Sequence, residues 1–146
     1  MAEELFGSDV VITKSGTTTA TEALQGVKFY CIYFSMHHCP PCREFTPIFV
    51  DLYNEINADE KVFEVIFVSG DKTQEEYDQY YAEMPWLALP RADKRIANIA
   101  KTFEVRGVPR LIVLKPDGTV INKSAVEKVS KEGPAAIDEF LEAASQ

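Results

Sequence analysis

The sequence predicts an α/β protein, with a central mixed β-sheet flanked by helices on both faces. Two largely apolar runs, at 29–34 and 63–69, are typical of strands that are covered on both sides. Segments with the apolar spacing of a helix lie between these runs and after them. The resulting order, β-α-β-α-α-β-β-α, favours one sheet packed between helices. Because the 146 residues contain no linker or repeat, we expect a single domain over 1–146.

The first half of the chain supplies two strands and the longest helix. A short strand is expected at 10–13, closed by Lys14-Ser15-Gly16, and the run 29–34 is expected to be a central strand. A helix begins after Pro40-Pro41. Its apolar residues recur at i, i+3, i+4 and i+7, so we expect one buried face, formed by Phe45, Ile48, Phe49, Leu52, Tyr53 and Ile56.

The second half continues with a strand at 63–69. Thr73 and Glu76 have the spacing of a capping box, which predicts a helix from there to about residue 81, and a further helix is expected at 93–103. Strands at 110–114 and 119–121 flank Pro116-Asp117-Gly118 and indicate an antiparallel hairpin. Gly133-Pro134 opens a C-terminal helix, because proline suits the first turn.

Composition and charge exclude several classes of function. The net charge of −8 disfavours binding to nucleic acid or to an anionic membrane, since both need a basic face. No apolar run is long enough to cross a membrane, and the acidic start of the chain is unlike a signal peptide, so we expect a cytoplasmic protein. Three cysteines are too few for a disulfide scaffold.

The motif Cys39-Pro40-Pro41-Cys42 carries the chemistry, because it stands where a buried strand gives way to a helix. A thiolate is the form of cysteine that attacks disulfides, and the unpaired N–H groups of a helix N-terminus favour the anion. Cys39 is therefore the expected nucleophile. Cys42 lies one helical turn further on, close enough to resolve a mixed disulfide formed at Cys39. The two prolines stiffen the turn between the sulfurs.

The histidines beside the motif and the third cysteine have alternative interpretations. His37, His38, Cys39 and Cys42 could form a zinc set, but adjacent ligands crowd around one tetrahedral ion and no second Cys/His pair follows, so we predict no metal site. Cys31 lies inside the expected central strand, where a cysteine behaves as a small, inert apolar residue.

Several segments together resemble the tryparedoxin and nucleoredoxin branch of the thioredoxin superfamily, over nearly the whole chain. They are the run from Phe34 through Cys39-Pro40-Pro41-Cys42-Arg43 to Pro47, Val68-Ser69-Gly70-Asp71, Met84-Pro85-Trp86-Leu87-Ala88-Leu89-Pro90, Val108-Pro109, and Pro116-Asp117-Gly118. The resemblance implies a thioredoxin fold, with Cys39 as nucleophile and Cys42 as resolving residue. It also implies that Pro109 is cis, faces the sulfurs, and with the carbonyl of Val108 binds an incoming peptide.

The resemblance further implies an enzyme that reduces protein disulfides, such as those of peroxiredoxins, without a bound cofactor. Electrons would come from a low-molecular-weight dithiol or from a flavin reductase. We expect Pro40, Pro41 and Trp86 to contribute to substrate binding, although packing is the favoured explanation of Trp86. The alternative function is a redox-sensing binding module, as in nucleoredoxins, with little turnover.

The sequence departs from this branch beside the cysteines. His38 stands where tryptophan is usual, and Arg110 follows the cis proline, where the residue is usually small or neutral. Both could place positive charge near Cys39 and modulate it; alternatively, His38 is a solvent-facing substitution and Arg110 a contact for an acidic partner. Tyr33 occupies the position of the buried acid of many thioredoxins, so no internal carboxylate base is expected.

Overall fold

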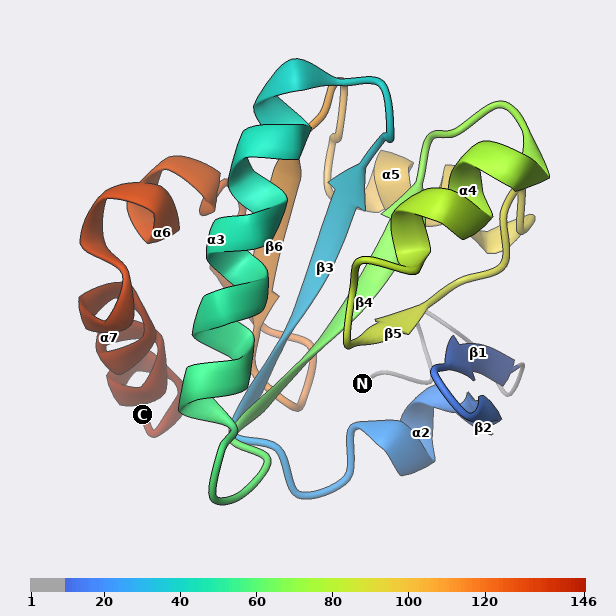
Figure 1. Cartoon of the computed structure of the whole chain (residues 1–146). Helices are drawn as coiled ribbons and strands as arrows, with labels where there is room; N and C mark the ends of the chain where they lie inside the picture. The colour runs from blue at the N-terminus through green and yellow to red at the C-terminus, as the bar shows by residue number, and fades with distance from the viewer. Residues whose placement is uncertain (1–9) are drawn as a thin grey trace.

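The fold is built on a seven-stranded mixed sheet. The computed structural model describes residues 10–146, and its strands lie in the order β2-β1-β5-β4-β3-β6-β7 (Figure 1). Strand β4 pairs in parallel with β3 and β5, and the remaining pairs are antiparallel. The strands are β1 (Val10–Thr13), β2 (Gly16–Thr19), β3 (Phe29–Ser35), β4 (Phe63–Ser69), β5 (Leu87–Ala88), β6 (Arg110–Leu114) and β7 (Val120–Asn122).

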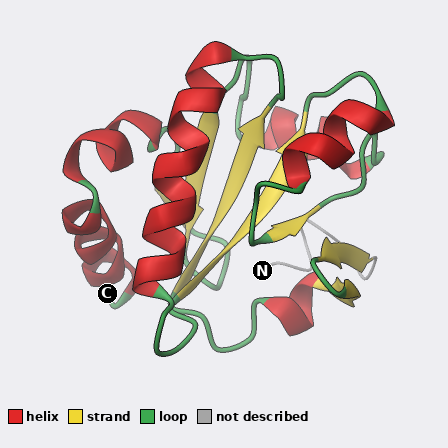
Figure 2. Cartoon of the chain, viewed as in Figure 1, coloured by secondary structure: helices red, strands yellow, loops and turns green. Residues whose placement is uncertain are grey.

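Helices cover both faces of this sheet (Figure 2). They are α2 (Ala20–Ala23), α3 (Pro40–Ile56), α4 (Gln74–Tyr81), α5 (Arg95–Thr102), α6 (Val126–Glu132) and α7 (Pro134–Ala144). Buried residues of α3, α4, α6 and α7 form one core, and those of α2 and α5 form a second. The expected α/β architecture, a mixed sheet between helices, is therefore confirmed.

The two cores explain the apolar run of β3. Alternate side chains of a strand point to opposite faces. Cys31 and Tyr33 enter the core beneath α3, whereas Ile32 and Phe34 enter the core on the α5 side. Strand β3 also has a neighbour on each side, since Cys31 pairs with Val65 of β4 and with Val113 of β6. All seven residues of β3 are consequently buried.

Helix α3 departs from the sequence prediction at one residue. Phe45, Phe49 and Leu52 are buried as expected, but Ile48 is 44% exposed. Ile48 lies at the margin of the apolar stripe, beside Gly133 and Pro134, where a glycine and a proline ring are too small to cover it. The expected buried face is therefore wrong at this position.

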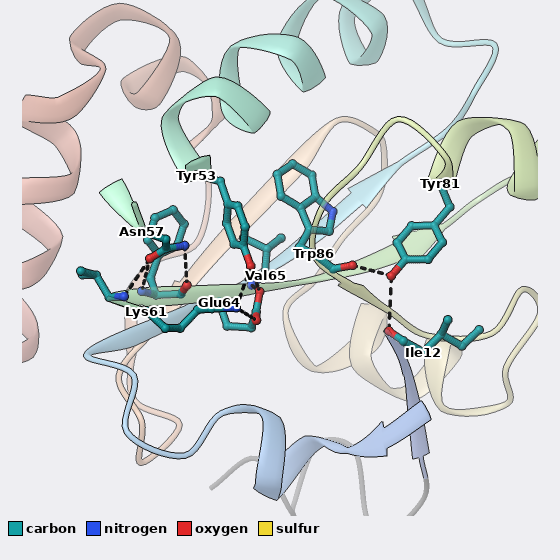
Figure 3. A network of polar contacts seen from close by, with 10 residues as sticks. Ile12, Tyr53, Asn57, Lys61, Glu64, Val65, Tyr81 and Trp86 are labelled. Carbon is teal, nitrogen blue, oxygen red and sulfur yellow. Dashed lines mark hydrogen bonds and ion pairs between the residues drawn. The ribbon is translucent and has the colours of Figure 1, made fainter. Parts of the chain in front are cut away.

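A network of polar contacts lies at the end of the sheet opposite to the cysteines (Figure 3). Glu64 is 3% exposed, and its carboxylate accepts hydrogen bonds from the Tyr53 hydroxyl at 2.8 Å and from Lys61 at 2.9 Å. Beside it, the Tyr81 hydroxyl donates to the carbonyl oxygen of Trp86. A buried charge is tolerated only when it is paired in this way. No helix within residues 10–146 is long and apolar enough to span a membrane.

Candidate active site: a cysteine pair at the start of α3

Parallel strands β3 and β4 end at the same edge of the sheet, and the candidate site lies there. Asp71, just beyond β4, accepts a hydrogen bond from the backbone N–H of His37 at 2.7 Å, and Ser69 Oγ donates to the same carboxylate at 2.7 Å. Gly70 approaches Met36 so closely that a Cβ would lie 2.7 Å from Met36 Cγ. These contacts fix the loop that leads from β3 into α3.

Cys39 and Cys42 meet at the N-terminus of α3. Cys39 is the N-cap residue and is half-buried, whereas Cys42 is 0% exposed. Their Sγ atoms lie 2.6 Å apart, which is close enough for a disulfide bond of about 2.05 Å to form with a small movement. The structure thus brings together the two residues that the motif predicts.

The loop before β6 approaches the same sulfur. The Val108–Pro109 peptide bond is cis, and the carbonyl oxygen of Val108 lies 3.9 Å from Cys39 Sγ. Both residues are half-buried and so present part of their surface beside the nucleophile. The expected cis bond and the approach of the Val108 carbonyl to Cys39 are observed, whereas a role of Val108 and Pro109 in binding peptides stays a prediction.

Cys42 is held as a neutral thiol. Burial raises the pKa of Cys42 to about 11, and the neighbouring Cys39 adds to this through a hydrogen bond and its charge. The hydroxyl of Ser35 and a backbone contact with Met36 act in the opposite direction, because they favour the thiolate. Cys42 is thus both less exposed and harder to ionise than an ordinary cysteine, as suits a residue that acts second.

A surface hollow of about 550 Å³ opens beside Cys39 and is lined by His37, His38, Cys39, Pro40 and Arg43. His38 Nε2 lies 2.7 Å from a carboxylate oxygen of Glu76, and Arg43 pairs with Glu83 at 2.9 Å. Both acids belong to α4 or its C-terminal end, so His38 and Arg43 at the rim each have an acidic partner. The His38 side chain is 69% exposed, and it lines the hollow together with Cys39.

The other residues named from the sequence lie apart from the hollow. Arg110 donates through Nε to the carbonyl oxygen of Lys123 at 2.7 Å, and Pro41 is exposed one residue beyond Pro40. Trp86 is 1% exposed within the core beneath α3. This burial favours the packing interpretation of Trp86, and a contact with substrate stays a prediction.

Four hydroxyl groups lie behind Cys42, and sequence reasoning missed three of them. They belong to Tyr33, Ser35, Thr46 and Tyr80. Thr46 could have been found, since it stands four residues after Cys42 on the same helix face. Tyr80 gives no such signal, because only the packing of α4 against α3 brings its hydroxyl to this place. Within residues 10–146 no group of three or more His, Cys, Asp or Glu side chains is arranged to hold a metal ion.

The third cysteine is isolated from this site. Cys31 is 1% exposed, and burial, reinforced by the charge of Glu64, raises its pKa well above the usual range. The unfolded chain loses this proton near pH 9, whereas the folded chain keeps it. The free energy of unfolding should therefore fall as the pH rises above 9.

Cys31→Ala should remove this pH dependence. The stability advantage of the wild type over Cys31→Ala is expected to shrink by about 2 kcal/mol between pH 8.5 and pH 10.5, in urea unfolding of both proteins. All other ionisable groups are shared by the two proteins, so the difference reports on Cys31 alone. An advantage that stays constant with pH, or alkylation of all three thiols in the native wild type, would contradict the buried assignment.

Comparisons with known proteins agree with this geometry. A family model described as thioredoxin-like matches residues 26–120. A probable nucleoredoxin 1 of Arabidopsis thaliana is 46% identical over 126 residues, which are 86% of this chain and 22% of that protein. The tryparedoxin of Trypanosoma brucei brucei is 35% identical over 93% of this chain and 94% of its own length.

Solved structures of tryparedoxins have the same fold as this chain. Tryparedoxin II from C. fasciculata superposes with a TM-score of 0.83 at 36% identity, covering 92% of this chain and 89% of that one. The chain spans about a quarter of the nucleoredoxins that it matches, 22% of the plant protein and 28% of the Mus musculus protein. The resemblance to tryparedoxins and nucleoredoxins is confirmed, and the chain belongs to the thioredoxin-like family of oxidoreductases.

Proposed function

We propose that the chain reduces disulfide bonds of other proteins through a dithiol–disulfide cycle of Cys39 and Cys42. The observation that supports this most directly is the asymmetry of the pair: two sulfurs 2.6 Å apart, one half-exposed at a surface hollow and one fully buried. An accessible thiolate can attack a disulfide on another protein, and a covered neighbour can act only on the sulfur beside it.

The cycle has two thiol–disulfide exchanges. Cys39 attacks one sulfur of the substrate disulfide, so that a mixed disulfide forms and the first substrate thiol leaves. Cys42 then attacks Cys39 Sγ, the intramolecular disulfide forms, and the second substrate thiol leaves with the proton that Cys42 gave up. Two electrons thereby pass from the pair to the substrate, and an external dithiol must return them.

The partners follow from the tryparedoxin relatives. We propose peroxiredoxin-type disulfides as substrates and a low-molecular-weight dithiol or a flavoenzyme as electron donor, in the cytoplasm. One solved neighbour, 33% identical to this chain, is tryparedoxin II in complex with glutathionylspermidine, which supports a small-molecule donor. The site offers a donor of that size a hollow of about 550 Å³ beside Cys39.

Reduction of insulin in the presence of dithiothreitol tests the proposal. The wild-type chain is expected to speed precipitation of the insulin B chain well beyond dithiothreitol alone, because Cys39 opens onto the hollow and Cys42 Sγ lies 2.6 Å away to complete the exchange. The rate should saturate with insulin concentration. A folded, fully reduced chain that gave no acceleration would contradict reductase activity.

The nucleoredoxin matches favour a second candidate, a redox-sensing binding module. Those relatives are several times longer than this chain, so the matched segment is one part of a larger protein in them. In such a module the same cysteines would change oxidation state without useful turnover. A chain that binds a partner in one redox state only, and leaves insulin intact, would support the module over the reductase.

A further inference from the structure

A buried cluster of four hydroxyl groups lies behind the resolving cysteine, and we call it the hydroxyl cluster: Tyr33, Ser35, Thr46 and Tyr80. Thr46 Oγ1 lies 2.7 Å from the Tyr33 hydroxyl and 2.7 Å from the Tyr80 hydroxyl. The Tyr80 hydroxyl also lies 2.5 Å from Ser35 Oγ. All four residues are buried, so their hydrogen bonds must be satisfied within the protein.

The direction of each hydrogen bond follows from counting protons, since each hydroxyl has one to donate. Thr46 donates to the carbonyl oxygen of Cys42 at 2.9 Å, so its oxygen can only accept from the two phenols. Tyr80 therefore gives its proton to Thr46. Its own oxygen must then accept from Ser35, the remaining neighbour.

This arrangement points the proton of Ser35 away from Cys42. It suits the resting state, in which Cys42 is a neutral thiol that donates toward Cys39 Sγ. When Cys39 is bound in a mixed disulfide, its sulfur carries no negative charge, and Cys42 must ionise to attack it. The new thiolate then needs a donor, and Ser35 lies beside it.

We propose that Ser35 and Tyr80 form a hydrogen-bond switch that stabilises the Cys42 thiolate during the resolving step. Ser35 turns its proton from Tyr80 to the sulfur, and Tyr80 turns its own proton from Thr46 to Ser35. Thr46 still accepts from Tyr33, so no buried hydroxyl loses its only partner. The proton of Cys42 leaves with the departing substrate thiolate. Tyr80 is thus a positioning residue that acts through Ser35, and the inference rests on the proposed dithiol cycle.

Other charged or titratable groups also face these residues. The Arg43 guanidinium lies 5.6 Å from the centre of the Tyr80 ring, and the centre of the His37 ring also lies 5.6 Å from it. Cys39 adjoins Cys42, and Tyr33 reaches the cluster from β3. Removing only the phenolic oxygen of Tyr80 leaves all of these groups in place, so a changed pH profile would report on the switch.

The test separates the two exchange steps with the aromatic disulfide DTNB. Reaction with Cys39 releases one coloured thiolate, and attack by Cys42 on the mixed disulfide releases a second, which stopped-flow absorbance resolves in time. Tyr80→Phe should slow the second release roughly tenfold at pH 7.5, the effect of one hydrogen bond to a charged group, and should move its pH midpoint upward. The first release should be unchanged.

Tyr77→Phe is the matched control. It removes another buried phenol of α4, whose hydroxyl donates to the carbonyl oxygen of Leu89 and not to the hydroxyl cluster, so it carries a similar packing change. It should leave both releases at the wild-type rate. Ser35→Ala should reproduce the slow second release, and the double variant Ser35→Ala/Tyr80→Phe should be no slower than Ser35→Ala alone, because both act on one interaction.

The outcomes distinguish the switch from the dithiol cycle itself. Equal second-release rates and pH midpoints in Tyr80→Phe and Tyr77→Phe would overturn the switch, as would an equal slowing of both releases. The switch would also be overturned if the double variant slowed the second release by the product of the two single slowings, because Ser35 and Tyr80 would then act independently. If the wild type released only one thiolate, Cys42 would not resolve, and the proposed function would fail first.

Discussion

Replacing Cys39 with serine should reduce insulin turnover to the background given by dithiothreitol, a loss of more than about a thousandfold, because removal of a nucleophile removes the covalent step itself. Cys42, at 0% exposure and with a pKa raised to about 11, cannot substitute for it. The insulin assay measures this loss directly. Cys31→Ser is the matched control, since it also exchanges one sulfur for oxygen but lies outside the site.

Cys42→Ser should behave differently, because the first exchange needs only Cys39. Mixed disulfides should then accumulate on Cys39, and mass spectrometry of the trapped species would identify the protein partners. Serine at 42 keeps the size of the side chain, so the loop and α3 should be undisturbed. Faster alkylation of Cys42 than of Cys39 in the reduced wild type would reverse the two roles.

Trp86→Ala should cost about 3–5 kcal/mol of stability, as expected for a large aromatic side chain removed from a packed core. The indole is 1% exposed, and its ring centre lies 5.1 Å from that of Phe49 and 5.5 Å from that of Tyr53. Figure 3 shows Trp86 next to Tyr53, at the end of the sheet that the Glu64 network closes. Urea unfolding followed by circular dichroism measures the loss.

Trp86→Phe separates packing from substrate contact at this position. Phenylalanine keeps most of the buried apolar surface, so this variant should lose less stability than Trp86→Ala while retaining wild-type insulin reduction. A stable Trp86→Ala protein with a raised KM for insulin would instead indicate that the Trp86 ring contributes to substrate binding. Within residues 10–146 the buried indole N–H has no hydrogen-bond partner, so its loss should add no penalty to either variant.

The sequence predicts the long elements well but misses some of the short ones. Strands β3 and β4 are buried on both faces and therefore appear as apolar runs, and α3 is long enough for its period to show. Strand β2 is four residues, Gly-Thr-Thr-Thr, and β5 is two, so neither contains a pattern that could be recognised. Their strand conformation comes from pairing with β1 and β4, which is a tertiary effect.

The residues of the candidate site likewise fall into those that the sequence predicts and those that only the folded chain reveals. Cys39 and Cys42 could be predicted because they are close in the sequence and stand at a strand–helix junction. The Glu76 partner of His38 could not, because α4 meets the active-site loop only in the folded chain. Ile48 shows that tertiary contacts also decide exposure within a well-predicted helix. It has the helical spacing of the apolar face, but its exposure depends on its small neighbours Gly133 and Pro134, between α6 and α7.

Within residues 10–146 the sheet ends in β2 on one side and β7 on the other. An edge strand leaves backbone N–H and C=O groups unpaired, which a second chain can use to extend the sheet. Here one edge is four residues with its outermost Gly16 and Thr17 exposed, and the other is three residues with an irregular register against β6. Neither offers a long, flat template, so the edges formed by residues 10–146 are poorly suited to edge-to-edge aggregation.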